Sequence, residues 1–388
     1  MIEDITPPPF ITIAIPFFFL LMGVEVLIGK FKKEKYYNFS DSIADLSTGV
    51  LSQLSGIFLK AFTLLGYLYV YNNYKFLTIP FESIFGWILA IVLWDFLYYW
   101  LHRLSHEVNI LWAGHVIHHH SEEYNLIVAL RQTSLGGIIS WIFFIPMAFL
   151  GIHPWVFLAA GQLNLIYQYW VHTKSIKSIG VVGEFLLSTP SHHRVHHAVN
   201  PQYIDRNHGG IFIIWDRMFG TFEKEVEPPV YGIVKPLESF NPLWANFHYY
   251  IEILKMVWNA EGFLNKIKVI YKPPGWYPST IDKKEGYSPI PKVSPDTFIK
   301  YNHDIKNSKK MYVLLWFIFV LLFSFLYLIF QAKFDTQNKI VISLWIALSL
   351  ISLNALLENK KWSVLLDSIR IISTPVVGFI VLTYLKVI

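Results

Sequence analysis

The chain of 388 residues contains no cysteine. This excludes disulfide bonds, iron–sulfur clusters and thiolate-bound haem or zinc, so any metal must be held by nitrogen and oxygen donors. Charge is also scarce: charged residues make up 15% of the sequence, with 32 Lys and Arg against 27 Asp and Glu, and no basic block is dense enough for nucleic-acid binding. The 15 histidines are therefore the obvious pool of metal ligands.

Long apolar runs dominate the remainder, because 54% of the residues are hydrophobic and 17% aromatic, which argues against a set of soluble domains. A helix needs about 20 apolar residues to cross the bilayer core. Runs of that kind lie near residues 10–29, 46–71, 82–101, 134–172, 311–330, 340–357 and 368–385. The fourth is about twice a span in length and breaks at Gly151-Ile152-His153-Pro154, which predicts two helices joined by a tight turn. We expect an all-α, multi-pass transmembrane helical bundle of about eight spans.

Two other segments bear on this organisation. The stretch Met1-Ile2-Glu3-Asp4 lacks the basic region of a secretory signal, so we expect the first apolar run to remain as a span. Residues 173–310 are richer in Lys, Pro, Gly and Tyr, which indicates a water-exposed region. Within it, an amphipathic helix is predicted, which either lies on the membrane surface or packs on its own domain. Its apolar face comprises Leu243, Phe247, Tyr250, Ile251, Leu254 and Trp258.

Basic residues next to the spans predict the orientation, because cytoplasmic loops retain Lys and Arg. Four lysines lie within residues 30–35, after the first span, whereas Lys75 stands alone in the next loop. Alternating the spans from that point places residues 102–133 and 173–310 in the cytoplasm. Every histidine except His153 falls on that side. Because histidine positions were not used to assign the topology, this agreement favours one shared cytoplasmic site.

Three histidine motifs carry the chemistry. The third span ends in an H-x-x-x-H motif whose two imidazoles lie one helical turn apart and can hold one metal ion. Two H-x-x-H-H boxes follow, at residues 115–119 and 193–197, and the adjacent pair in each box can reach two different metals. His172 ends the fifth span, and His192 precedes the last box. The candidate metal ligands are His102, His106, His115, His118, His119, His172, His192, His193, His196 and His197.

Polar residues accompany these motifs inside the apolar runs. Asp95 shares a helical face with His102, and Gln168 lies one turn before His172. A carboxylate inside a span needs a partner, so Asp95 either orients a ligand imidazole or forms a purely structural hydrogen bond between helices. We expect Gln168 to support the site in the same way. His120 and His208 exceed what the boxes require and are expected to support a ligand or to lie at the surface.

The donor set favours two irons. No H-E-x-x-H motif is present, and eight or more nitrogen donors exceed the four that one zinc ion needs. Two irons with O2 can oxidise an unactivated C–H bond, and the bilayer supplies lipid substrates. A metal-binding or metal-transporting membrane protein is an alternative, although transport sites usually lie near the middle of the bilayer rather than at span ends. A zinc hydrolase would need a general-base glutamate among the boxes.

At these residues the chain resembles the fatty acid hydroxylase/sterol desaturase superfamily of membrane di-iron oxygenases, whose pattern is H-x-x-x-H, H-x-x-H-H and a final H-x-x-H-H. Within that superfamily, it is most similar to the alkylglycerol monooxygenases. The stretches that carry this resemblance are Asp95 to Gln132, Ser191 to His197, Asn207 to Gly210 and Trp215 to Phe222.

The resemblance implies that the box histidines bind two Fe ions, with His172 and His192 as additions, and that the enzyme uses O2. It implies hydroxylation of the alkyl carbon next to an ether oxygen, after which the hemiacetal collapses to a fatty aldehyde and a glycerol derivative. Hydroxylation or desaturation of fatty acids, sterols or carotenoids is the alternative within the superfamily. Tetrahydrobiopterin is implied as the external reductant. Glu107, Asn125 and Arg131 are candidate contacts for the reductant or a lipid headgroup, or form ordinary interfacial hydrogen bonds.

The chain is therefore expected to have four parts. N-terminal spans occupy residues 1–81, and a superfamily-type catalytic core occupies residues 82–225. A cytoplasmic or interfacial segment follows at residues 226–310, and C-terminal spans at residues 311–388. The partners expected are a lipid substrate from the bilayer, the membrane itself and an electron donor, with no nucleic acid.

Overall fold

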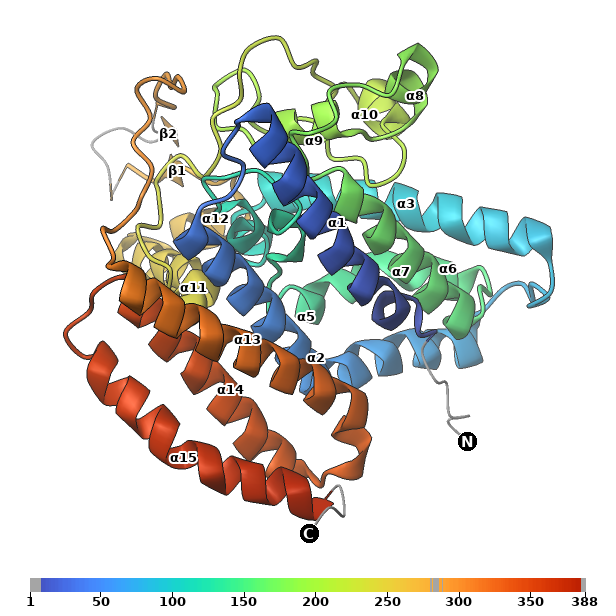
Figure 1. The fold of residues 1–388 in the computed structure, drawn as a ribbon. Coiled ribbons are helices and arrows are strands. Elements are labelled where there is room, and N and C mark those ends of the chain that lie inside the picture. Colours follow the sequence, from blue (N-terminus) through green and yellow to red (C-terminus); the bar gives the residue numbers. More distant parts are fainter. Residues whose placement is uncertain (1–7, 280, 282–285, 288, 385–388) are drawn as a thin grey trace.

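The computed structural model describes residues 8–279, 281, 286–287 and 289–384. Within these residues the protein is helical, apart from one antiparallel pair of two-residue strands, β1 (Trp276–Tyr277) and β2 (Gly286–Tyr287) (Figure 1). The predicted helical fold class is confirmed. The N-terminal residues Met1–Asp4 and Leu385, the last residue of the final predicted span, lie outside the described residues.

Five helices are long and apolar enough to cross a membrane. They are α1 (Phe10–Lys32), α3 (Ile84–Glu107), α13 (Asn307–Phe330), α14 (Thr336–Leu357) and α15 (Ser363–Tyr384). A sixth is α2 (Phe39–Tyr74), if its two halves, which meet at 45°, form one span. In the part of the chain that the structure describes, the count is thus five or six rather than about eight.

The difference lies in the long apolar run at residues 134–172. The predicted turn is present, because Gly151 has a left-handed φ of +76° and a Cβ there would lie 2.0 Å from the carbonyl oxygen of Leu77. The two arms, however, are shorter than the roughly 20 residues of a typical span. The first is divided into α5 (Gly137–Ser140), η3 (Trp141–Phe144) and α6 (Ile145–Phe149), and the second, α7 (Pro154–Trp170), has 17 residues. Hydropathy counts apolar residues across such breaks, so the two spans expected in this run are not confirmed. The hairpin packs against α2 and α3.

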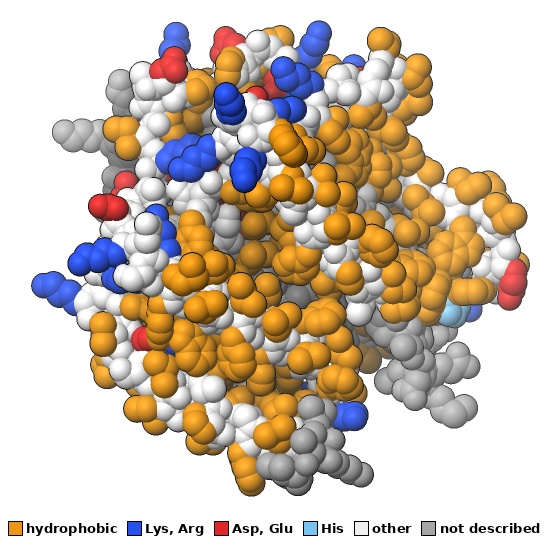
Figure 2. All heavy atoms as spheres, in the orientation of Figure 1, with side chains coloured by type: hydrophobic (Ala, Val, Ile, Leu, Met, Phe, Trp, Pro, Cys, Tyr) orange, Lys and Arg blue, Asp and Glu red, His pale blue; other side chains and the backbone are white. Residues whose placement is uncertain are grey.

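The histidine-bearing cap consists of short helices and loops at one end of the long helices (Figure 1). Its helices are α4 (Asn109–Ala113), η1 (Val116–His119), η2 (Val128–Leu130), α8 (Val181–Leu186), α9 (Pro190–His196), α10 (Ile214–Phe219), α11 (Pro242–Asn259) and α12 (Phe263–Tyr271). One further short helix, η4 (Gln331–Lys333), joins α13 to α14. On the face in Figure 2, hydrophobic side chains cover most of the surface, and most Lys and Arg side chains lie toward its upper and left edges.

A buried carboxylate fixes α1 to this cap. Glu25 lies in the middle of the apolar helix and is only 2% exposed. Its carboxylate accepts a hydrogen bond from the main-chain N–H of Leu126 at 2.9 Å and others from the hydroxyls of Tyr37 and Thr173. Because a buried charge is costly without partners, these contacts specify where α1 lies against the cap.

The C-terminal helices are held together by a second buried polar cluster. Arg370 of α15 is fully buried, and its Nη2 lies 2.7 Å from Oδ1 of Asp367. Its guanidinium lies 4.1 Å from the ring centroid of Trp316 in α13 and donates to the hydroxyl of Tyr312. The cluster links α13 to α15, while apolar residues of α2, α13 and α14 form the adjoining core.

The predicted amphipathic helix is α11. One of its faces packs on the cap, where Ile253 and Met256 join a buried cluster with Val269 of α12. The other face remains apolar and exposed, and includes Leu254 at 66% and Trp258 at 84% exposure. Packing on its own domain, one of the two predicted alternatives, therefore holds for one face of α11. Contact of the other face with the membrane stays a prediction.

Candidate metal centre

The end of α3 supplies the first two candidate ligands. His102 and His106 lie one turn apart on the buried face of the helix and are 3% and 6% exposed. The helix ends immediately afterwards at Glu107. The apolar helix α3 thus carries two imidazoles at the end that lies in the cap.

The two H-x-x-H-H boxes divide their adjacent histidines between two groups. The first box consists of His115 and the 3-10 helix η1 that follows it, and the second consists of the end of α9 and the next residue, His197. His119 and His196 face one group, while His118 and His197 face the other. The structure thus places the members of each adjacent pair in different groups, as the spacing predicted.

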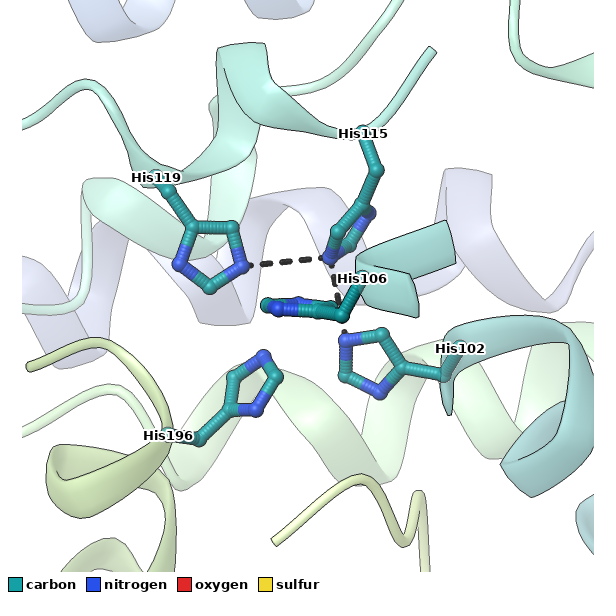
Figure 3. A group of neighbouring side chains, drawn as sticks. All are labelled: His102, His106, His115, His119 and His196. Carbon is teal, nitrogen blue, oxygen red and sulfur yellow. Dashed lines mark hydrogen bonds between the residues drawn. The ribbon is translucent and has the colours of Figure 1, made fainter. Parts of the chain in front are cut away.

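Nine histidines form these two groups. Within each group, one ring nitrogen from each histidine lies within 4.8 Å of those of all the others. Figure 3 shows the rings of the first group, from α3, η1 and its approach, and α9, arranged around a common point. The first group comprises His102, His106, His115, His119 and His196, and the second comprises His118, His172, His193 and His197.

The spacing of the nitrogens fits metal coordination. In the first group, Nε2 of His115 lies 3.0 Å from Nε2 of His102 and 3.1 Å from Nε2 of His119. In the second, Nε2 of His172 lies 3.2 Å from Nε2 of His118 and 3.0 Å from Nε2 of His193. Two ligands about 2.1 Å from one metal ion, at right angles, are separated by about 3.0 Å.

Main-chain carbonyls orient four of the rings. Nδ1 of His102 donates to the carbonyl of His208 at 2.8 Å, and Nδ1 of His118 donates to that of Arg131 at 2.9 Å. His172 and His196 do the same to the carbonyls of Gln168 and Arg206, at 2.8 and 2.9 Å. Each bond places the hydrogen on Nδ1 and leaves Nε2 as the lone-pair donor facing its group.

Burial keeps the imidazoles in the form that binds metals. It lowers the pKa of His118 from 6.5 to about 4, and burial together with neighbouring histidines lowers the pKa of His115 and His197 well below 6.5. These rings are therefore neutral at pH 7. The buried Nε2 atoms of His106 and His196 have no hydrogen-bond partner among the described residues. Buried ring nitrogens that lack a hydrogen-bond partner fit a site built for metal ions.

Asp95 and Gln168 support the groups indirectly. The carboxylate of Asp95 accepts hydrogen bonds from Asn164 of α7 and from the loop after His208, but from no imidazole. Gln168 accepts the His172 ring N–H through its main-chain carbonyl, while its side chain bonds to Tyr98 and Asn164. Asp95 thus forms a helix–helix bond and also fixes the loop whose carbonyl orients His102.

Three of the other histidines occupy different environments. His192 faces away from both groups, with Nε2 3.2 Å from Oε2 of Glu184. His208 is fully buried beside the first group, its ring centroid 5.1 Å from that of His106. His120 is buried against His248, outside both groups. Buried His208 could have been suspected from its place in the Asn207–Gly210 motif, but motif spacing cannot place it beside the first group.

The candidate reductant contacts each have different partners within the protein. Glu107 pairs with Arg103 at 2.9 Å, and Asn125 donates to the carbonyl of Tyr36 at 2.9 Å. Arg131 is buried, with Nη1 2.6 Å from Oδ1 of Asp45 in α2 and Nε 2.6 Å from the carbonyl of Ile117. Sequence reasoning missed Asp45 because it lies far along the chain from the motifs.

Known proteins are similar in sequence to most of the chain. It is 39% identical over 365 residues to the alkylglycerol monooxygenase of Homo sapiens, an alignment that covers 94% of this chain and 81% of that protein. The chain belongs to the alkylglycerol monooxygenase family. This family member is also 39% identical over 366 residues to the alkylglycerol monooxygenase of Danio rerio, with 94% and 81% covered.

More distant relatives place the family within a wider group. A sequence model described as fatty acid hydroxylase matches residues 87–221, which include all three histidine motifs. The ornithine lipid hydroxylase of Rhizobium tropici is 30% identical over 149 residues, covering 36% of this chain and 43% of that protein. No solved structure matches the chain. The predicted membership of the superfamily, and of its alkylglycerol monooxygenase branch, is confirmed.

Proposed function

We propose that this protein is a di-iron monooxygenase that cleaves the ether bond of alkylglycerols drawn from the bilayer. The observation that carries the proposal is the pair of buried all-histidine groups, whose neighbouring ring nitrogens lie 3.0–3.2 Å apart. Relatives named alkylglycerol monooxygenase, aligned over 94% of the chain, supply the substrate class. The proposed catalytic core spans residues 82–225.

The five-histidine group would hold one iron and the four-histidine group the other. Imidazole suits iron as well as zinc, and nine such donors exceed the need of a single ion. When bound, the two irons supply the activation of O2. His192 belongs to neither group, so it is left out of the proposed ligand set.

The chain's own residues hold this chemistry in place. The carbonyls of His208 and Arg131 fix the tautomers of His102 and His118, so the ligand nitrogens are oriented before metal binds. Burial of the rings keeps bulk water from the centre, which favours transfer of oxygen to the lipid over wasteful side reactions. Because α3 carries both the exposed Ile84 and Phe85 and the ligand His102, the same helix joins the apolar surface to the metal site.

The net reaction consumes two electrons. One oxygen atom of O2 enters the C–H bond next to the ether oxygen, and the other leaves as water with two electrons and two protons. The hemiacetal formed then collapses to a fatty aldehyde and a glycerol derivative. We propose tetrahydrobiopterin as the electron source and the cytoplasmic side of the membrane as the location of the cap, the latter because Lys30 to Lys35 follow α1.

The test is product analysis with a defined alkylglycerol, O2 and tetrahydrobiopterin as the reductant. Purified protein loaded with iron should form one fatty aldehyde per O2 consumed, and a monoacylglycerol of the same chain length should give none, because it lacks the ether-activated carbon. A variant such as His119→Ala serves as the control for metal-independent oxidation. Hydroxylated or desaturated lipid without aldehyde would instead place the activity with the other lipid hydroxylases and desaturases, and absence of O2 uptake by iron-loaded protein would refute the oxygenase.

A further inference from the structure

The short helix α8 of the cap exposes apolar side chains and turns its charge inward. It has the sequence Val-Val-Gly-Glu-Phe-Leu, and Val181 and Val182 are 87% and 72% exposed. Its single charged residue, Glu184, faces α9, where its carboxylate accepts hydrogen bonds from the hydroxyls of Thr189 and Ser191. A helix at a water-exposed surface shows the opposite distribution, because its charged side chains face water and its apolar ones face the core.

The neighbouring helix α10 has the same distribution. Asp216 is fully buried, whereas Met218 is 63% and Phe219 36% exposed. The guanidinium of Arg217 donates to the main-chain carbonyl of Phe185 at 3.2 Å and thereby links α10 to α8. The two helices share one exposed apolar surface, the α8–α10 patch, whose members are Ile179, Val181, Val182, Phe185, Met218 and Phe219.

Helix α10 packs against the apolar part of α3, one of the helices that can cross a membrane. The ring centroid of Phe219 lies 4.9 Å from that of Trp100, and the ring centroid of Trp215 lies 5.1 Å from that of Phe96. Phe96 precedes Arg103, the first basic residue at this end of α3, by seven residues, or about 10 Å along the helix axis. The cap therefore reaches alongside a part of α3 that would lie among lipid chains.

The α8–α10 patch continues the apolar surface of the spans. Figure 1 shows α8 and α10 together at one edge of the cap, beside α3, and Figure 2 shows mostly hydrophobic side chains over this region. The opposite end of α3 exposes Ile84 and Phe85 in the same way. The chain segment that follows α10 differs, because it exposes the charged residues Lys224 and Glu227.

We propose that α8 and α10 are embedded in the bilayer, with the α8–α10 patch among the acyl chains of the leaflet next to the cap. Large exposed apolar surfaces mark contact with a membrane or with another protein. Protein interfaces carry a polar rim and hydrogen-bonding groups, whereas this patch is apolar throughout and adjoins a membrane-crossing helix. Lipid is therefore the occupant that fits it. This part of residues 173–310 then departs from the water-exposed character expected from composition.

The embedded helices lead directly to the metal centre. Helix α9, which carries His193 and His196, begins at Pro190, four residues after α8 ends at Leu186. Lipid chains around the α8–α10 patch would thus lie next to the helix that holds ligands of both histidine groups. This placement goes beyond the proposed function, because it holds whatever reaction the centre catalyses.

The experiment uses the absence of cysteine from the chain. An environment-sensitive fluorophore is attached at Val182→Cys in iron-loaded, full-length protein in phosphatidylcholine nanodiscs. The matched control is Val226→Cys, because Val226 is also an exposed valine, at 71%, but lies between Glu225 and Glu227. We expect the Val182→Cys label to emit at shorter wavelength and to be quenched at least about three-fold more strongly by nitroxide-labelled acyl chains than the control label. Iodide in the water phase should quench the control label more strongly.

Two results would overturn the proposal. Equal iodide quenching at the two positions would show that the patch lies in water. A Val182→Cys label shielded from both iodide and the nitroxide lipids would show that a second copy of the chain covers the patch. If Val182→Cys does not fold, Val181→Cys places the label on the same exposed surface.

A charge placed in the patch provides an independent test. Val182→Asp should lower the melting temperature in nanodiscs, because a carboxylate among acyl chains is costly. Val226→Asp should leave the melting temperature unchanged, because its side chain stays in water. Equal melting temperatures for the two variants would contradict the embedded position of α8.

Discussion

The ring nitrogen Nδ1 of His102 lies 2.8 Å from the main-chain carbonyl oxygen of His208, 106 residues further along the chain. The carbonyl can only accept, so Nδ1 carries the hydrogen and Nε2 points its lone pair at His115. Two buried carboxylates hold the loop that provides this carbonyl: Asp216 accepts from the N–H groups of His208 and Gly209, and Asp95 accepts from that of Ile211. The ring of His102 is therefore oriented through Asp216 and Asp95, which belong to neither histidine group.

Replacement of Asp95 tests this chain of contacts. Its two oxygens accept from Asn164, Ile211, Phe212 and Trp215 at 2.6–3.0 Å, and an asparagine would aim an NH2 group at one or more of these donors. We expect Asp95→Asn to fold but to bind iron about ten-fold more weakly, measured by metal analysis after competition with a chelator. Asp296→Asn, which changes an exposed carboxylate, is the control. Equal iron retention in the two variants would show that Asp95 serves only the packing of α3 on α7.

Two adjacent histidines provide a sharp contrast. His193 belongs to the four-histidine group, whereas His192 contacts Glu184 and belongs to neither. We expect His193→Ala to lower iron from about two toward one per chain and activity more than about 100-fold, because a ligand is lost. His192→Ala should keep both irons and lose activity less than about five-fold. Equal losses in the two variants would contradict the division of the histidines into two groups.

Acid should destabilise the metal-free protein. Burial lowers the pKa of His118 to about 4, below the 6.5 of the unfolded chain, so between these values the unfolded chain binds more protons. Stability is then lost as pH falls from about 6.5 to 4, by roughly 3 kcal/mol for His118 alone. We expect the melting temperature of the metal-free protein, followed by circular dichroism, to drop between pH 7 and pH 5. A melting temperature that stays constant or rises over this range would contradict the buried, neutral state of the rings.

The exposed apolar face of α11 and α12 should contact lipid. Leu254, Trp258, Phe263 and Leu264 are each at least 66% exposed, which is unfavourable in water but suits an interfacial helix pair. Because the chain has no cysteine, a spin label can be attached at Trp258→Cys alone. In nanodiscs, the label should be relaxed more by O2 than by a water-soluble nickel complex. A label at Lys224→Cys, an exposed cap position, should show the reverse, and the same preference at both positions would refute membrane contact.

The sequence predicted the local features well and the long-range ones poorly. Box spacing placed His118 and His119 toward different groups, and the turn near Gly151 was readable from its Gly-Ile-His-Pro sequence. The expected count of about eight spans is not confirmed, because hydropathy does not register where α5, η3 and α6 divide the helix. Partners far apart in the sequence, such as Arg131 and Asp45, could not be paired without the fold.

The same limit applies to the ligand set. A histidine motif shows which imidazoles are near one another along a helix, but not which way a ring turns at the helix end. His192 and His193 are neighbours in the sequence, yet the first faces Glu184 and the second faces His172. The side on which a helical residue is buried depends on tertiary packing, which sequence spacing does not contain.

The central claim is that the two histidine groups hold two irons, and the most direct test is the metal content of purified, folded protein expressed with iron available. Mass spectrometry should find about two irons per chain, because nine buried or half-buried imidazoles in two groups form two sites. Zinc as the dominant metal, or no more than one metal ion per folded chain, would contradict the account.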